Sequence, residues 1–313
     1  MKFWVGVTDK SWFDFLASKP SIDEVNFWQP SGDTGFRAIQ PWESFLFKLH
    51  SPLNFIVGGG LFVKYSQLPL SIAWETFQEK NGAGDFQSFR ERILHYQQNT
   101  SRHFVPDPFI GCIVLTNPFF FKKEDWIPVP ENWSANIVRG KTYDTEDPIG
   151  SSLWEKVDER IKGINPVQDN NILQVEVKEP RYGGEYLTRP RLGQGAFRVV
   201  VIDAYNRRCA ITGERTLPAL ESAHIKPYAS SGPHCINNGI LLRSDLHKLF
   251  DAGYMTINTD LRVEVSKYIK EEYENGHDYY ALHGKKLTNL PSDPLDQPSK
   301  KYLEWHNKEV YER

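Results

Sequence analysis

The chain has 313 residues, a mass of 36.2 kDa and a formal net charge of −3. A hydrophobic content of 40% with 25% charged residues excludes a disordered chain, and at about 100–200 residues per domain two domains are expected. No apolar run approaches the ~18 residues that a membrane span needs, and the N-terminus lacks the features of a secretory leader. We therefore expect a cytoplasmic protein with no membrane association.

The three cysteines, Cys112, Cys209 and Cys235, are too few and too scattered for a disulfide framework. No CxxC pair occurs in the sequence, so we expect no structural zinc.

Aromatic residues are concentrated in the first half of the chain. Eight of nine tryptophans lie at or before Trp154, and seventeen of nineteen phenylalanines at or before Phe121. Short β-like runs bounded by turn signals predict strands over residues 2–7, 25–28, 44–49, 54–65 and 110–116. Helices are predicted over 9–17, 69–79 and 86–96. The Gly58-Gly59-Gly60 run predicts a bulge or a close backbone approach. The pattern favours an α+β protein whose first domain is a small β-barrel with helices.

The stretch 138–150 is rich in turn residues and is expected to close the first domain. A helix is predicted over 151–162, with Ser151 or Ser152 as its N-cap and Glu155 as the capping-box partner. We therefore divide the chain into a first domain over 1–150, a linker over 151–188 and a second domain over 189–313.

The charge distribution changes between the two halves. Residues 1–180 carry 18 basic and 23 acidic side chains, whereas residues 181–313 carry 19 and 17. Arginines are dense at the start of the second domain, and a guanidinium group matches the geometry of phosphate oxygens. An ordinary solvated helix is the alternative. The candidate phosphate contacts are Arg189, Arg191, Arg198, Arg207 and Arg208.

Two histidines and an asparagine fall on consecutive predicted elements of the second domain. His224 ends a predicted strand, Asn238 lies fourteen positions later before a second strand at 239–242, and His247 lies nine positions further on a short helix over 244–250. A β-hairpin followed by a helix would bring these three side chains together. A predicted hairpin over 254–265 and a helix over 300–311 complete the domain.

This arrangement resembles the HNH, or ββα-metal, nuclease motif. The resemblance extends over roughly residues 190–265 and is carried by CAITGERT, SAHIKPY and NNGILLRSDLHKLFDAG. It implies hydrolysis of DNA phosphodiester bonds with a single divalent metal ion. This ion is expected to be Mg²⁺, with Mn²⁺, Ni²⁺ or Co²⁺ as alternatives. A neutral histidine can remove a proton from water, so His224 is the candidate base and His247 a candidate metal ligand. Asn238 is expected to hold the loop that carries His224, with a role as metal ligand as the alternative.

The sequence departs from this family where many relatives have an acidic metal ligand before the base histidine, because Ala223 stands there. The available carboxylates are Glu221, Asp245 and Asp251. We rank Glu221 above Asp245 as the second ligand, since Asp245 and His247 are two residues apart on one helix and their side chains diverge.

The first half is similar in outline to the PUA-like superfamily, which includes the EVE, ASCH, YTH and SRA modules. The similarity rests on WVGVTDKSWF, VNFWQPSG, FLFKLHSP, NFIVGGGLFV and AWETFQEKNG. It implies a barrel that accepts one flipped base in an aromatic pocket. Core packing is the alternative role for each tryptophan, and turn or capping roles for the polar residues. The candidate base-binding residues are Trp12, Trp28, Trp74, Asp9, Asn26 and Gln29.

Together these features predict a modification-dependent DNA endonuclease that reads 5-methylcytosine or 5-hydroxymethylcytosine in double-stranded DNA. A homodimer is expected, because one HNH site cuts one strand. Two alternatives remain: an HNH effector nuclease whose first domain senses a nucleotide signal or RNA, and a modified-base binding protein with a decayed nuclease.

Overall fold

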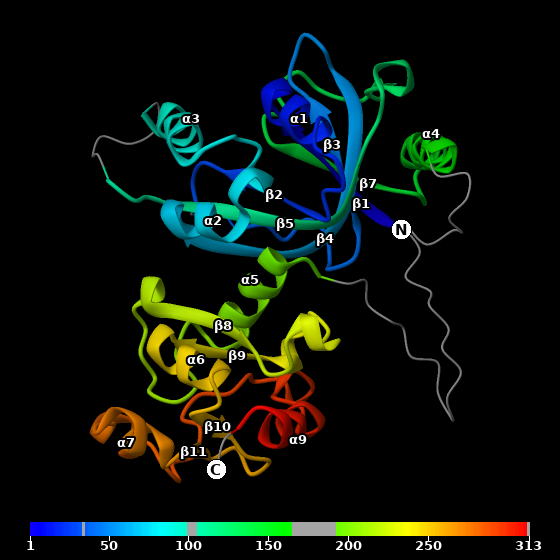
Figure 1. The fold of residues 1–313 in the computed structure, drawn as a ribbon. Coiled ribbons are helices and arrows are strands. Elements are labelled where there is room, and N and C mark those ends of the chain that lie inside the picture. The colour runs from blue at the N-terminus through cyan, green and yellow to red at the C-terminus, as the bar shows by residue number, and fades with distance from the viewer. Residues whose placement is uncertain (33–34, 99–104, 165–191, 312–313) are drawn as a thin grey trace, which may run out of the picture. The chain divides into compact units, whose positions relative to one another are not determined.

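The computed structural model describes residues 1–32, 35–98, 105–164 and 192–311, and the chain divides into two compact units, Met1–Pro190 and Arg191–Arg313 (Figure 1). The strands of the first unit are β1 (Lys2–Thr8), β2 (Glu24–Gln29), β3 (Ser44–Leu49), β4 (Phe55–Pro69), β5 (Phe109–Phe120), β6 (Ile127–Pro128) and β7 (Gly140–Asp144). Its α-helices are α1 (Lys10–Ala17), α2 (Leu70–Phe77), α3 (Phe86–Gln98) and α4 (Pro148–Ile164). No helix in these ranges, or in the described part of the second unit, is long and apolar enough to cross a membrane.

The first unit is built on one sheet of seven strands. The order is β2-β5-β4-β3-β1-β7, and the short β6 pairs with β4. β1 and β3 run parallel, whereas the other pairs are antiparallel. All five strands predicted from the sequence are present, but the expected barrel is not confirmed. The path of the described strands is open, with β2 and β7 at its two ends, because barrel closure depends on tilt and stagger between strands distant in sequence.

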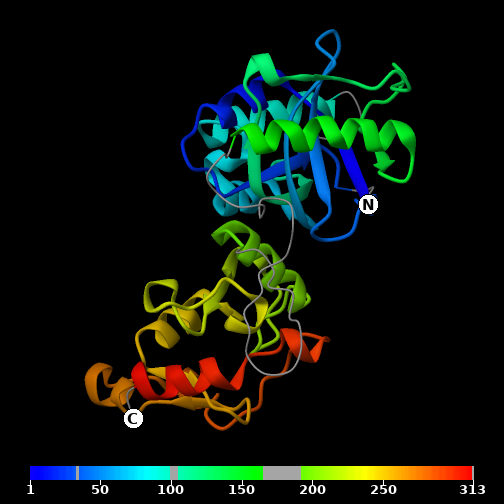
Figure 2. The same ribbon diagram turned by 90° about the vertical axis from the view of Figure 1, so that its right-hand side faces the viewer.

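Both faces of this sheet are covered by helices, and side chains that alternate along a strand enter opposite cores. Phe45 and Phe47 of β3 pack in one core with Trp12 and Phe13 of α1. The residue between them, Leu46, lies in the other core. Figure 2 shows α4 lying across the sheet, where Leu153, Val157 and Ile161 contribute to this second core.

Helix α4 begins earlier than the sequence indicated, and a different residue caps it. Asp147 Oδ1 accepts hydrogen bonds from the backbone N–H groups of Ile149 (2.8 Å) and Gly150 (3.2 Å). The cap predicted at Ser151 or Ser152 is therefore wrong, since both lie inside the helix, and Ser151 Oγ donates to Glu155 instead (3.3 Å). Residue 150 also lies within α4, so this helix runs across the expected domain boundary.

The glycine run in β4 marks a close approach between backbones. A Cβ atom at Gly58 would lie 2.2 Å from the carbonyl oxygen of Phe119, and one at Gly59 would lie 2.6 Å from that of Phe45. The register between β4 and β5 shifts between Gly59 and Leu61. The predicted bulge and close approach are thus both confirmed.

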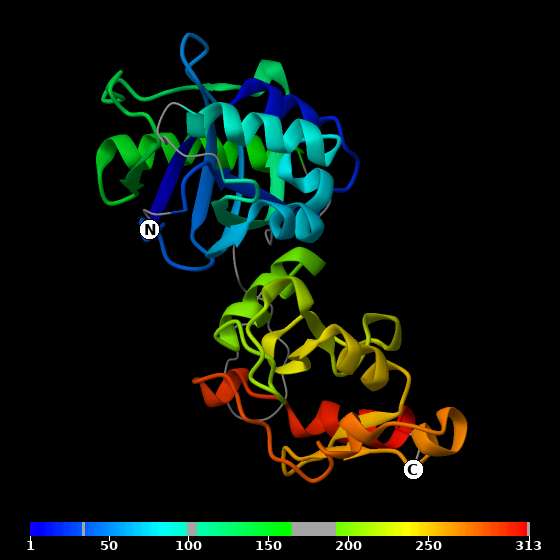
Figure 3. The same ribbon diagram turned by 90° about the vertical axis from the view of Figure 1, so that its left-hand side faces the viewer.

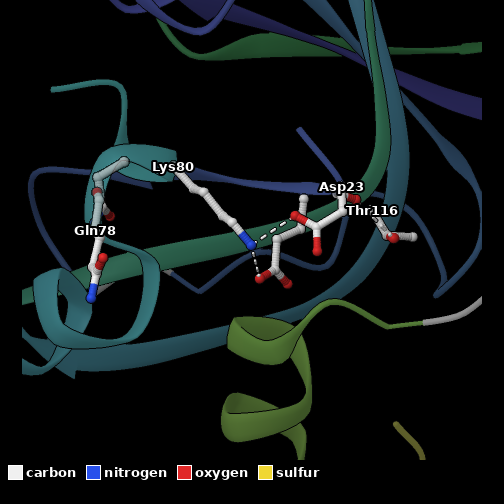
Figure 4. Close-up of polar contacts among 6 residues, drawn as sticks. Asp23, Gln78, Lys80 and Thr116 are labelled. Carbon is white, nitrogen blue, oxygen red and sulfur yellow. Dashed lines mark hydrogen bonds and ion pairs between the residues drawn. The ribbon is translucent and has the colours of Figure 1, made fainter. Parts of the chain in front are cut away.

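A buried carboxylate on the edge strand β2 is neutralised by a lysine from the 3₁₀ turn Gln78–Asn81 that follows α2. Lys80 Nζ lies 2.8 Å from Oε1 of the fully buried Glu24 and 2.7 Å from Oδ1 of Asp23 (Figure 4). Burial opposes the charge of Lys80, but the two carboxylates outweigh this effect and raise its pKa. Figure 3 shows α2 and α3 next to each other on this part of the unit.

The second unit contains α5 (Gln194–Ala204), β8 (Leu220–His224), β9 (Gly239–Arg243), α6 (Ser244–Asp251), β10 (Met255–Ile257), β11 (Val263–Val265), α7 (Tyr268–Tyr273), α8 (His277–Tyr280) and α9 (Lys300–Glu309). β8 pairs antiparallel with β9, and β10 with β11. Both predicted hairpins are present, and α6 and α9 follow the predicted helices within two residues. One apolar core joins α5, both hairpins, α6 and α9.

A buried histidine connects α9 to this core. His306 is 1% exposed and stacks on Phe250 with ring centroids 3.7 Å apart. Its Nε2–H donates to the Phe250 carbonyl (3.0 Å), so its Nδ1 accepts from the hydroxyl of Thr256 (2.8 Å). Burial lowers the pKa of His306 to about 4, although the carbonyl and the charge of Asp251 act in the opposite direction.

We predict that His306 makes the second unit sensitive to acid. The neutral ring is favoured in the folded state, so its contribution is complete above the unfolded pKa near 6.5 and is lost as the pH falls toward 4. The loss is about 3 kcal/mol over this range. Urea unfolding from pH 7 to 4.5, with pulsed hydrogen exchange read on β8 and β9, should show a weaker pH dependence for His306→Phe. The exposed His277→Phe serves as control, and equal slopes in all three proteins would contradict the prediction.

Candidate active site and base pocket

The pairing of β8 with β9 brings His224 and Asn238 to the same end of a hairpin. His224 is opposite Gly239 in the register, and Asn238 is the residue before it. The fully buried Asn238 side chain accepts from the Lys226 backbone N–H and donates to the carbonyls of Lys226 and Pro233, each at 2.9 Å. These three hydrogen bonds join the two ends of the loop between the strands, and they use both N–H groups of the Asn238 amide and one of the two lone pairs of its oxygen.

The ring of His224 is held between aromatic side chains. It stacks on Phe197 of α5 with centroids 3.8 Å apart and an interplanar angle of 13°. Its Nε2 lies 3.1 Å from Nδ1 of His234, which comes from the loop that Asn238 holds. Burial, followed by the charges of His234 and His247, lowers the pKa of His224 to about 4, against a smaller opposite effect of Asp251. His224 is therefore neutral near pH 7, as a general base must be.

His247 has the opposite electrostatic environment. Its Nδ1 lies 2.6 Å from Oε2 of Glu221 on β8, and its Nε2 lies 3.2 Å from Oδ2 of Asp251, one helical turn further along α6. Burial lowers its pKa, but hydrogen bonds to Asp251 and Glu221 and their negative charges outweigh burial, and the pKa is raised. Only a protonated ring can donate to both carboxylates, so the geometry and the direction of the shift agree.

Asp245 does not join this group. Its carboxylate is paired with Arg243 through two hydrogen bonds, one of them Arg243 Nε to Oδ1 at 3.0 Å. The carboxylates that the structure brings to His247 are Glu221 and Asp251, so the geometry favours Glu221 over Asp245.

In the described ranges, no three His, Cys, Asp or Glu side chains surround a common position suited to a metal ion. The donor types beside His247 nevertheless fit a divalent cation, because two carboxylates supply the oxygen ligands that hard cations prefer and the imidazole suits Mn²⁺ or Ni²⁺. Coordination by His247 would require one of its ring nitrogens to lose its proton and its carboxylate partner.

The candidate phosphate-binding arginines are differently placed. Arg198 lies on α5 and is partly buried, Arg207 pairs with Asp203 (3.6 Å), and Arg208 is exposed. Arg189 and Arg191 lie outside the described residues.

A second concave site lies in the first unit, at the end of β1 and β2 next to α1 and α3. Its volume is about 220 Å³. It contains Asp9, Trp12, Trp28 and Gln29 of the predicted base-binding set, and its other lining residues are Val7, Thr8, Phe27, Pro30, Ser31, His50, Tyr96, Val138 and Arg139. Asn26 and Trp74 do not line this pocket. Asn26 is fully buried and donates to Asn81 (2.9 Å), and Trp74 packs on Phe89 of α3 with centroids 5.9 Å apart.

The polar groups of the pocket are of two kinds. Asp9 is engaged, because the Tyr96 hydroxyl lies 2.9 Å from both carboxylate oxygens and His50 Nε2 lies 3.5 Å from one of them. Burial and this carboxylate raise the pKa of Tyr96 to about 12. By contrast, Trp12 Nε1 and Gln29 Oε1 are buried atoms with no hydrogen-bond partner in the structure. One atom is a donor and the other an acceptor, and both residues are among those that line the pocket.

Comparison with known proteins identifies the class of the second unit. Residues 209–258 match the family model of HNH endonucleases, and the match includes His224, Asn238 and His247. This segment is an HNH endonuclease domain, which confirms the interpretation from sequence, and the chain therefore carries a nuclease domain.

Two solved structures show a remote likeness to this chain. A crystal structure of a mutant ZmASCH protein from Zymomonas mobilis is 10% identical, with 50% of this chain and 99% of that chain covered and a TM-score of 0.32. A modification-dependent TagI restriction endonuclease is 12% identical, with 98% and 81% covered and a TM-score of 0.29. Both TM-scores are too low to establish a shared fold. No curated protein sequence matches the chain significantly.

Sequence reasoning missed several residues that the structure adds to the two sites. His234 was not considered, although a histidine four residues before Asn238 could have suggested it. Tyr96 and His50 reach Asp9 from distant elements, and no sequence signal connects them.

We predict that Asn238→Ala loosens the loop between β8 and β9 without unfolding the chain. The change removes the three hydrogen bonds that the fully buried Asn238 side chain makes to backbone groups of the loop, which lowers the stability by about 2–3 kcal/mol. Hydrogen exchange over 225–238 should accelerate and DNA cleavage should fall at least tenfold. Asn237→Ala is the matched control because Asn237 makes none of these bonds. Unchanged exchange in the Asn238 variant would refute the role.

Proposed function

We propose that the chain is a modification-dependent DNA endonuclease in which the first unit binds a flipped, modified base and the HNH domain hydrolyses a nearby phosphodiester bond. The observation that carries this proposal is the presence, in one chain, of an HNH domain and of a pocket in the first unit whose lining residues include a buried donor and a buried acceptor without partners. The proposed substrate is double-stranded DNA with 5-methylcytosine or 5-hydroxymethylcytosine, and the proposed place of action is the cytoplasm.

In the nuclease site we assign the general base to His224, because it is neutral at physiological pH and partly accessible. It would take a proton from the water that attacks the phosphorus. His247, with Glu221 and Asp251, would hold the divalent cation. When bound, that ion would stabilise negative charge on the phosphate and on the leaving oxygen. Asn238 would position the loop, and Arg208, which is the exposed one among the described candidate arginines, would contact a DNA phosphate.

The pocket of the first unit suits a planar heterocycle. At ~30 Å³ per water molecule, its volume corresponds to about seven waters. Trp28 and Tyr96 contribute aromatic surface, with ring centroids 6.0 Å apart. The amino group of a cytosine could donate to Gln29 Oε1, and a ring acceptor could receive the Trp12 N–H, which would satisfy both buried atoms. Trp12 itself is 2% exposed and packs edge-on to Phe27 and Phe47, so we propose it as a donor and not as a stacking wall.

Cleavage of both DNA strands requires two HNH sites, so we propose that the active form on duplex DNA is a homodimer. A monomer would nick one strand. The oligomeric state during cleavage distinguishes the two.

We predict metal-dependent cleavage confined to modified DNA. One long DNA prepared in unmodified, 5-methylcytosine, 5-hydroxymethylcytosine and N6-methyladenine forms is incubated with Mg²⁺, Mn²⁺ or EDTA. Only a modified-cytosine form should be cut, and EDTA should abolish cutting. His224→Ala should retain binding and lose about 10²–10⁴-fold in rate. Equal cutting of all four forms would reject base reading and favour a first unit that senses a nucleotide or RNA.

We also predict that Trp12→Phe weakens the preference for modified DNA. The change removes the indole N–H and keeps an aromatic ring, so affinity for a duplex with one modified cytosine should fall about tenfold, or about 1.4 kcal/mol. Binding is measured by fluorescence anisotropy in the His224→Ala background, against an unmodified duplex. Trp74→Phe is the control, because Trp74 lies away from the pocket. An unaltered preference in Trp12→Phe would exclude this donor from base recognition.

A further inference from the structure

His234 lies beside the nuclease site, and the roles assigned above leave it without a function. It comes from the loop between β8 and β9, and its Nδ1 is 3.1 Å from Nε2 of His224. Its ring is oriented by Tyr228, on which it stacks with centroids 4.9 Å apart, and by the edge of Phe197 at 5.7 Å. Phe197 also stacks on the His224 ring, so the same aromatic side chain contacts both imidazoles.

The hydrogen bond between the two histidines needs one proton, and its position decides what His224 can do. If His234 Nδ1–H were the donor, His224 Nε2 would accept, and the neutral His224 ring would carry its own proton on Nδ1. Neither nitrogen of His224 could then take a proton from water. If His224 Nε2–H is the donor, Nδ1 keeps its lone pair and is basic. Among the described residues, His224 Nδ1 has no hydrogen-bond partner that would block it.

We propose that His234 is a positioning residue that accepts the Nε2–H of His224 and thereby presents His224 Nδ1 as the basic nitrogen. This inference rests on the proposed role of His224 as the general base. When Nδ1 takes a proton, the His224 ring becomes positively charged, and the bond from Nε2–H to His234 strengthens because its donor is now charged. Enzymes that hold a catalytic histidine in the wrong tautomer lose orders of magnitude in kcat.

Two substitutions distinguish the effect of the aromatic packing of the His234 ring from the effect of its hydrogen-bond acceptor. His234→Phe keeps an aromatic ring against Tyr228 and Phe197 but has no acceptor. His234→Asn loses the ring but places an amide oxygen near the position of Nδ1. If His234 acts through the hydrogen bond, His234→Phe lowers kcat 10–100-fold with little change in KM, as for other residues that orient a catalytic group. His234→Asn should recover most of the rate. The exposed His277→Ala controls for the loss of a histidine.

The position of the proton is measured without reference to activity. In the full chain labelled with ¹⁵N-histidine, the proton of the hydrogen bond should show one-bond coupling to His224 Nε2, assigned by its loss in His224→Gln. Its signal should disappear in His234→Phe and persist in His234→Asn. Coupling of this proton to His234 Nδ1 would overturn the proposal. A kcat that is retained in His234→Phe and lost in His234→Asn would overturn it as well. Full cleavage by His224→Ala would instead reject the base assignment, whichever nitrogen carries the proton.

Discussion

The antiparallel pairing of β8 with β9 is the constraint on which the nuclease site depends. It places Glu221 opposite Leu242 and His224 opposite Gly239. Because α6 begins directly after β9, the side chain of His247 on this helix reaches Glu221 on β8. Gly239 is required at this position because a Cβ atom would lie 2.5 Å from a methyl group of Val201 on α5. The same close approach allows α5 to bring Phe197 against the ring of His224.

This arrangement gives two histidines of one small site opposite protonation behaviour. His224 lies against an aromatic ring and near other imidazoles, which disfavours its charged form. His247 lies between two carboxylates, which favour its charged form more than burial disfavours it. A neutral imidazole and a carboxylate-rich group therefore occur together, which is the separation of roles that the proposed general-base hydrolysis with a divalent cation would need.

The buried polar groups of the first unit are of two kinds: those that have a hydrogen-bond or ion-pair partner and those that have none in the structure. On β2, Glu24 is neutralised by Lys80, and Asn26 is bonded to Asn81, so these groups belong to the framework of the sheet. In the pocket at the end of the same strand, Gln29 Oε1 has no partner. An unmet buried group lowers stability unless a ligand supplies its partner, and Asn26 Oδ1, which does not line the pocket, is likewise a buried atom without one.

The sequence by itself determined most of the strands and helices, the three residues of the HNH motif and four of the residues that line the pocket, because local periodicity and short-range spacing carry that information. It did not determine the open path of the sheet, the cap of α4 at Asp147, or the pairing of Asp245 with Arg243. The tertiary structure alone decided that Asp251 and Glu221 meet at His247, that His234 bonds to His224, and that the Trp12 donor is left without a partner. These contacts depend on the directions of side chains that come from loops or from elements distant in the sequence. The packing of the whole unit fixes those directions.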